Sequence, residues 1–148
     1  MDLIPLLGSK LKDDAVMELL ELWDCDVIYD FDRLHENTPD QYWASAKSEG
    51  LQLRFDEDQV LQCVFAHVAP SHDDDFSAAD LASTDIPWFR SIEDVVTYAE
   101  SNRLQTTAGR GVLFDQVRDW VKIDCGNHSI HYEFRNGSLG LVTVSKIS

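Results

Sequence analysis

Apolar and polar residues alternate along much of the chain in the way that is typical of strands with one buried face. Leu51, Leu53 and Phe55 alternate with polar residues, whereas residues 60–68 are apolar on both faces. The second pattern predicts a strand near the centre of a sheet, covered by a helix on at least one side. Toward the end of the chain, three strand-like runs are separated by DCGN and by the hairpin signal Asn136-Gly137, and they predict an antiparallel meander.

Two segments place apolar residues at helical spacing. Val16, Leu19, Leu20 and Trp23 share one helical face behind an acidic start that suits the helix dipole, which predicts an amphipathic helix over residues 13–22. Ser91 stands where the N-cap of a second amphipathic helix is expected, over residues 92–101, because an acid follows it three positions later in the manner of a capping box.

Two helices and about six strands, mostly adjacent in sequence, predict the α+β class. The expected fold is an antiparallel sheet of about five or six strands with two main helices packed on it. A length of 148 residues with 44% apolar content predicts a single domain with a sizeable core. Residues 69–91, rich in Ser, Asp and Ala, predict a long and mostly surface-exposed loop, and residues 102–111 show no regular pattern.

The charge of the chain narrows the kinds of partner it can have. Lys and Arg number 12 against 27 Asp and Glu, a formal net charge of −15. Long-range repulsion therefore disfavours direct binding to nucleic acid or to an anionic membrane, and a charged macromolecular partner is expected to be basic. The acidity is concentrated in residues 1–100, which hold 23 of the acids and 6 of the bases.

Targeting and cysteine patterns predict a cytoplasmic protein. Residues 3–7 form an apolar run too short for a secretion signal, and no later run approaches the length that spans a membrane. Cys25, Cys63 and Cys125 are odd in number and widely spaced, which argues against a disulfide framework and against a zinc knuckle. We expect all three to be reduced structural thiols.

Patterns that indicate catalysis or metal binding are weak in this sequence. The run HDDD at residues 72–75 lacks EF-hand spacing, and successive side chains of an extended chain point in opposite directions, which favours a solvated or partner-facing acidic loop over a metal site. His128 and His131 would lie on opposite faces of a strand, and the chain has neither G-x-S-x-G nor a phosphate-binding loop. We therefore predict no enzymatic activity, no catalytic residue, no metal site and no cofactor.

Aromatic residues are interleaved with acids in the acidic part of the chain. This combination suits a protein interface, in which rings fill the desolvated centre and carboxylates form the rim. Around the long loop the candidate partner-binding residues are Asp73, Asp74, Asp75, Phe76, Asp80, Asp85, Trp88 and Phe89. The acids between residues 24 and 36, among them Asp30, Asp32 and Glu36, form a second candidate region. Trp88 and Phe89 follow a proline and could equally be core residues that close one edge of the sheet.

The order of the sequence segments resembles that of one functional class. Residues 42–144 carry GLQLRFDEDQVLQCVFAHV, an acid-rich loop, DIPWFRSIEDVVTYAES, RDWVKID and SIHYEFRNGSLGLVTVS. This order resembles the small cytosolic immunity proteins that bacteria encode beside polymorphic toxins of the contact-dependent inhibition, Rhs and type VI systems. The chain departs from several such families in having Ile86-Pro87-Trp88-Phe89, and not Leu-Pro-x-Gly, before the second helix.

The resemblance implies a non-enzymatic inhibitor that binds one cognate toxin domain in a 1:1 complex and blocks its active site or substrate path. Toxins that act on nucleic acids or nucleotides present a basic cleft, which an acidic surface can occupy in place of phosphate. Two other classes stay open: an enzyme with a carboxylate-bound divalent ion, and an acidic adaptor or regulatory domain. A binding screen with Mg²⁺, Ca²⁺, Mn²⁺ and Zn²⁺ distinguishes the first, and the identity of the neighbouring gene distinguishes the second.

Overall fold

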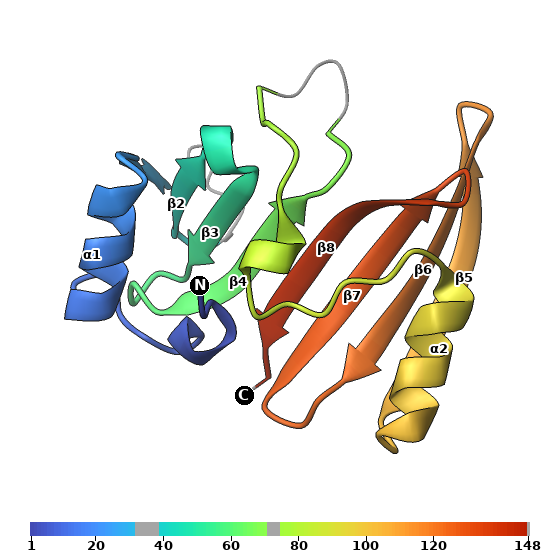
Figure 1. Ribbon diagram of the computed structural model, residues 1–148. Helices are drawn as coiled ribbons and strands as arrows, with labels where there is room; N and C mark the ends of the chain where they lie inside the picture. Colours follow the sequence, from blue (N-terminus) through green and yellow to red (C-terminus); the bar gives the residue numbers. More distant parts are fainter. Residues whose placement is uncertain (32–38, 71–74, 148) are drawn as a thin grey trace.

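One antiparallel sheet runs through the whole molecule (Figure 1). The computed structural model describes residues 1–31, 39–70 and 75–147. Within them, eight strands are arranged in the order β1-β2-β3-β4-β8-β7-β6-β5, and each is antiparallel to its neighbours. The strands are β1 (Val27–Asp30), β2 (Gln41–Ala46), β3 (Leu51–Phe55), β4 (Leu61–His67), β5 (Gln105–Leu113), β6 (Gln116–Asp124), β7 (His128–Arg135) and β8 (Ser138–Lys146).

The predicted α+β fold, with five or six strands and two helices packed on them, is wrong. The sheet has eight strands and dominates the fold. The α-helices of the described residues are α1 (Asp14–Leu22) and α2 (Ile92–Ser101), which lie near opposite ends of the sheet. Three short 3-10 turns accompany them: η1 (Ile4–Leu6), η2 (Lys47–Glu49) and η3 (Leu81–Ser83).

β5 lies where the sequence pattern indicated no strand. Its polar, glycine-containing sequence pairs with β6 along its whole length. Gly109 is required because a Cβ atom there would lie 2.6 Å from Nε1 of Trp120, whose ring lies against β5. The hairpin turn is Phe114-Asp115, with φ angles of 52° and 63°. Two positive φ angles are typical of a two-residue hairpin turn, but such turns usually contain Asn or Gly, and this one has neither. Because of these two features, the alternation of apolar and polar residues did not predict this strand.

Both helix predictions are confirmed to within one residue. α1 follows Asp13 and buries the predicted apolar face, including Val16, Leu19 and Leu20. α2 follows its predicted N-cap Ser91, whose hydroxyl accepts a hydrogen bond from the backbone N–H three residues later at 3.2 Å. Among the described residues, no helix combines the length and the apolar character that crossing a membrane requires.

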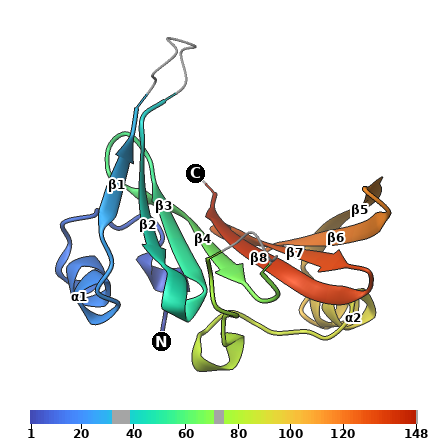
Figure 2. The same cartoon turned by 90° about the horizontal axis from the view of Figure 1, so that it is seen from above.

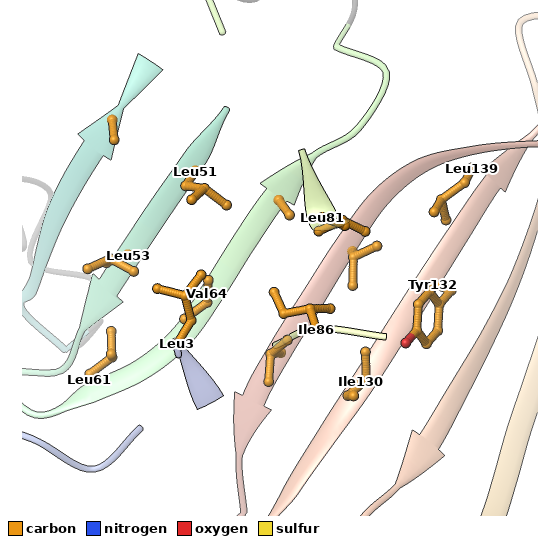
Figure 3. Packing of buried hydrophobic residues seen from close by; sticks show 14 of the residues in the cluster. Leu3, Leu51, Leu53, Leu61, Val64, Leu81, Ile86, Ile130, Tyr132 and Leu139 are labelled. Atoms are coloured by element: carbon orange, nitrogen blue, oxygen red, sulfur yellow. The ribbon is translucent and has the colours of Figure 1, made fainter. Parts of the chain in front are cut away.

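The second half of the long connection between β4 and α2 is not a surface loop, which corrects the prediction for residues 69–91. Leu81 and Ile86 are buried in the same apolar cluster as Leu3 and Val64 (Figure 3). They cover the central strands, over which the sequence pattern had predicted a helix. Isolated apolar residues in a polar segment show no periodicity, although each can fill space on a sheet face that the helices leave open.

The two faces of the sheet have different surroundings. Leu53, Val64, Val144, Ile130 and Ile123 pair across successive strands and are all buried, so they mark the covered face. Both α-helices, η3 and the N-terminal segment lie on this side (Figure 2). The sheet curves so that its opposite face is concave, and none of the described helices lies on that face. Side chains at alternate strand positions point into it.

Candidate functional site

Asp85, one of the predicted partner-binding acids, anchors the N-terminal segment. Its Oδ1 accepts the backbone N–H of Leu3 at 2.8 Å, and its Oδ2 accepts that of Ile4 at 3.1 Å. The backbone N–H of Asp85 in turn donates to the carbonyl oxygen of Met1 at 3.0 Å. Because Leu3 is fully buried, these bonds hold a core residue in place.

Replacing Asp85 with asparagine should lower the free energy of unfolding by about 1–2 kcal/mol, because the two backbone N–H groups lose a charged acceptor. Chemical denaturation measures the change. Asp80→Asn is the matched control, since asparagine caps a helical turn about as well as aspartate, and we expect a change of less than about 0.5 kcal/mol. Equal effects of the two substitutions would show that Asp85 has no special anchoring role.

The other described acids of this loop are closer to solvent. Asp80 caps η3 by accepting the backbone N–H two residues later at 3.1 Å. Asp75 is exposed and lies 3.1 Å from Nζ of Lys47. Phe76, next to it, is half-buried and stacks on His67 with ring centroids 4.2 Å apart. Asp75 and Asp80 are thus both exposed, although Asp75 is paired with Lys47 and Asp80 with its own turn.

Trp88 and Phe89 have opposite environments, which resolves the alternative left open by the sequence. Phe89 packs toward the core, with its ring centroid 5.1 Å from that of Tyr98 and 5.4 Å from that of Tyr132. Trp88 is 50% exposed, and Cζ of Arg90 lies 5.7 Å from the centroid of its ring. Trp88 is thus available to a partner, whereas Phe89 is the core plug.

Several predicted residues lie outside the described part of the chain. These are Asp32, Glu36, Asp73 and Asp74, so most of the HDDD run and two of the five acids of the second candidate region have no structural account. Asp30 is described and is exposed at the end of β1. Asp30 lies near the end of residues 13–31, a segment rich in exposed acids.

Residues 13–31, which form α1, β1 and the connection between them, make the most acidic exposed surface of this end of the molecule. They contain seven acids and no Lys or Arg. All seven carboxylates are exposed: Asp13, Asp14, Glu18, Glu21, Asp24, Asp26 and Asp30. We call these residues the α1–β1 surface. Its field attracts cationic groups over about 10 Å at an ionic strength of 0.1 M.

Large apolar side chains are exposed in the same segment. Ile28 is 63% exposed, and all four residues of β1 are accessible to solvent. The exposed apolar residues of this segment are Met17, Leu22, Val27, Ile28, Tyr29 and Phe31. Scattered exposed apolar side chains are normal, but six in one short segment are many. Those of β1 lie on both faces of the sheet edge, because Ile28 pairs with Trp43 and Tyr29 pairs with Tyr42.

The aromatic part of the α1–β1 surface is held in a defined arrangement. The hydroxyl of Tyr29 donates a short hydrogen bond to Oδ2 of Asp40 on the other side of the hairpin. This bond raises the pKa of Tyr29 to about 12, so the phenol stays neutral at physiological pH. The Tyr29 ring meets Tyr42 edge-on at 4.9 Å and stacks with Phe31 at 5.9 Å. Rings held in this way lose little side-chain entropy when a partner covers them.

Comparison of this chain with protein-family models, with curated proteins and with solved structures finds no match. The candidate site is therefore defined by the residues and geometry of this chain.

Groups suited to metal binding or nucleophilic catalysis do not converge in the described residues. No three His, Cys, Asp or Glu side chains there are placed to hold one metal ion. The three cysteines are free thiols. Burial raises the pKa of the Cys25 thiol, with a further contribution from Asp26, and burial together with Asp124 raises that of Cys125. Both thiols are therefore poor nucleophiles at neutral pH.

The concave face presents a second, chemically different surface. Trp43 and Phe65 form one ring pair at 5.8 Å, and Trp120 and His131 form another at 5.2 Å. His131 is half-buried, and this burial lowers its pKa. A hollow of about 600 Å³ opens here, lined by Lys122, Ser129, His131, Thr143, Ser145, Lys146 and Ile147.

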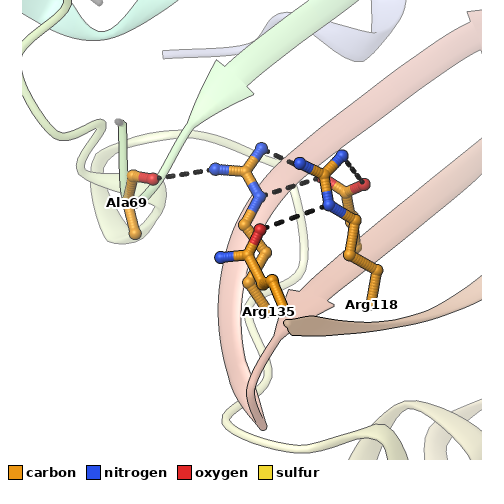
Figure 4. Close-up of polar contacts among 5 residues, drawn as sticks. Ala69, Arg118 and Arg135 are labelled. Atoms are coloured by element: carbon orange, nitrogen blue, oxygen red, sulfur yellow. Dashed lines mark hydrogen bonds and ion pairs between the residues drawn. The ribbon is translucent and has the colours of Figure 1, made fainter. Parts of the chain in front are cut away.

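Arginines are grouped at one end of the concave face (Figure 4). Nη2 of Arg135 donates to Oε2 of Glu133 at 2.9 Å, and Nη1 of Arg118 lies 3.6 Å from Oε1 of the same carboxylate. Arg135 also donates to the carbonyl oxygen of Ala69 at 3.2 Å, and Arg118 donates to Gln116 at 3.3 Å. Two cations thus share one half-buried anion, and Arg135 also ties the meander to the connection after β4.

The α1–β1 surface was only partly recognised in the sequence. The prediction emphasised the aspartate triplet and treated α1 mainly as a core helix. Two signals could have identified the surface. Residues 13–31 contain seven acids and no base, and they contain more apolar residues than the buried face of one helix can hold. The exposure of Val27, Ile28 and Tyr29 had no such signal, because consecutive β-branched and aromatic residues are equally typical of a buried strand.

Proposed function

We propose that this chain is an immunity-type inhibitor that binds one cognate, basic toxin domain in a 1:1 complex and blocks its active site or substrate path. The observation that supports the proposal best is the α1–β1 surface, where seven exposed carboxylates and no cation accompany six exposed large apolar side chains. The order of the sequence segments, which resembles that of immunity proteins, gives independent support.

Each component of the surface has its own physical role in such a complex. The carboxylates act at long range, accelerate encounter with a basic cleft and oppose binding to acidic proteins. The apolar side chains act on contact, since the stacked rings of Tyr29 and Phe31 can be desolvated at the centre of an interface while acids stay at its rim. A toxin that acts on nucleic acid or on nucleotides has the basic cleft that this arrangement fits.

The protein encoded by the neighbouring gene is the partner to test, and the proposal expects it to carry the toxin domain. Calorimetric titration should show 1:1 binding, and an equimolar amount of this protein should abolish the toxin's activity. A non-cognate toxin domain of similar positive charge is the control, since it separates specific inhibition from general attraction between opposite charges. Absence of binding, or equal binding to both domains, would contradict the proposed function.

A further inference from the structure

β1 is an edge strand with one unpaired side. Within the described residues it pairs with β2 alone, from Val27↔Ala44 to Asp30↔Gln41. Alternate residues of an edge strand direct their backbone N–H and C=O groups away from the sheet, where another strand can pair with them. A strand of four residues offers roughly two such residues, so side chains must supply most of the specificity.

The side chains of β1 do little to prevent such pairing. Natural edge strands are commonly protected by Lys, Pro or a bulge, whereas β1 has the sequence VIYD and three exposed apolar side chains. β5, at the opposite edge, has the sequence QTTAGRGVL, which is polar except at its end. Its Arg110 donates to Asp119 of β6 at 2.6 Å. The two edges therefore differ in both apolar exposure and charge.

Charge complementarity identifies the kind of strand that β1 can accept. A strand added beside β1 would place its side chains about 4.5–5.5 Å from those of Ile28 and Asp30. An aliphatic residue fits opposite Ile28, and Lys or Arg fits opposite Asp30, with Asp24 and Asp26 adding to the attraction of positive charge. A second copy of this chain is disfavoured, because it would bring two acidic segments together.

We infer that β1 binds an extended, basic segment of the toxin domain by strand addition, so that the sheet continues into the partner. This inference rests on the proposed function and specifies how the partner is held. Backbone hydrogen bonds along β1 give the complex its register, while Ile28 and Asp30 select aliphatic and cationic side chains.

Hydrogen exchange of the complex with the neighbouring toxin domain tests the inference. Amides of β1 should exchange about tenfold more slowly, or slower still, in the complex, because the outward N–H groups become paired. Amides of β5, the other edge strand, should be unchanged. Ile28→Lys should weaken binding about tenfold or more, since it places a cation beside a basic segment. Val112→Lys, on β5 at a site that is 68% exposed, is the matched control and should leave binding unchanged.

The possible outcomes separate the inference from the proposed function. Failure of the unmodified protein to bind the toxin overturns both. Inhibition without protection of β1, or equal effects of Ile28→Lys and Val112→Lys, overturns strand addition and leaves the proposed function standing. Protection of β1 that depends on protein concentration in the absence of toxin would identify a second copy as the occupant and would also overturn the inference.

Discussion

Replacing Asp24, Asp26 and Asp30 together with asparagine should slow association with the toxin domain about tenfold or more at low salt. The three carboxylates are exposed and lie around β1, where no base of the segment offsets their field. The difference between the variant and the unmodified protein should shrink at 1 M salt, because the Debye length falls from about 10 Å at 0.1 M to about 3 Å. Stopped-flow kinetics at the two ionic strengths measures both effects.

A variant with the same change in charge at the opposite end of the sheet is the control. Glu93, Asp94 and Glu100 are exposed on α2, and converting them to their amides also removes three negative charges. If net charge alone governed association, both triple variants would slow it equally. The proposal requires the α1–β1 variant to have the larger effect, and the reverse order would place the binding surface elsewhere.

Replacing Phe55 with alanine should lower the free energy of unfolding by about 3–5 kcal/mol. Phe55 is fully buried at the end of β3, where it pairs with Tyr42 and Leu61 on the neighbouring strands. Its removal would leave a cavity in the half of the core that supports α1 and β1. Urea denaturation followed by tryptophan fluorescence measures the loss. The comparison requires that the slope of unfolding free energy against urea concentration be the same for the variant and the unmodified protein.

Phe114→Ala is the matched control for this substitution. Phe114 is 93% exposed at the tip of the β5–β6 hairpin, so its removal should change the free energy of unfolding by less than about 0.5 kcal/mol. Similar costs at the two positions would mean that the apolar cluster around Phe55 does not stabilise the fold as described.

The helices and the central hairpins could be predicted because local interactions determine them. Ser91 caps α2 with its own hydroxyl, and the turn Asn136-Gly137 has the two positive φ angles, 50° and 84°, that its sequence predicts. The extent of the sheet could not be predicted in this way. β5 is polar because its residues are exposed on both faces of this edge strand and because Gly109 makes room for the Trp120 ring, a contact between strands that no local pattern reveals.

The candidate site was predictable in its charge but not in its location. A carboxylate in a loop can face a partner or bind its own chain. Asp85 accepts two backbone N–H groups that are more than 80 residues away in the sequence, and the residues around Asp85 do not reveal these contacts. Trp88 and Phe89 are adjacent and similar in type, yet only their packing separates an exposed ring from a half-buried ring that contacts the core. Long-range contacts decide such cases.

Carboxylate footprinting of the complex would show whether the toxin domain binds at the α1–β1 surface. A carbodiimide and an amine would label exposed Asp and Glu side chains in the free protein and in the complex, and mass spectrometry would locate the labels. We predict that labelling of Asp24, Asp26 and Asp30 falls in the complex, whereas labelling of Glu93 and Glu100 on α2 does not change. Unchanged labelling of the first group, with protection of the second, would contradict binding at this surface.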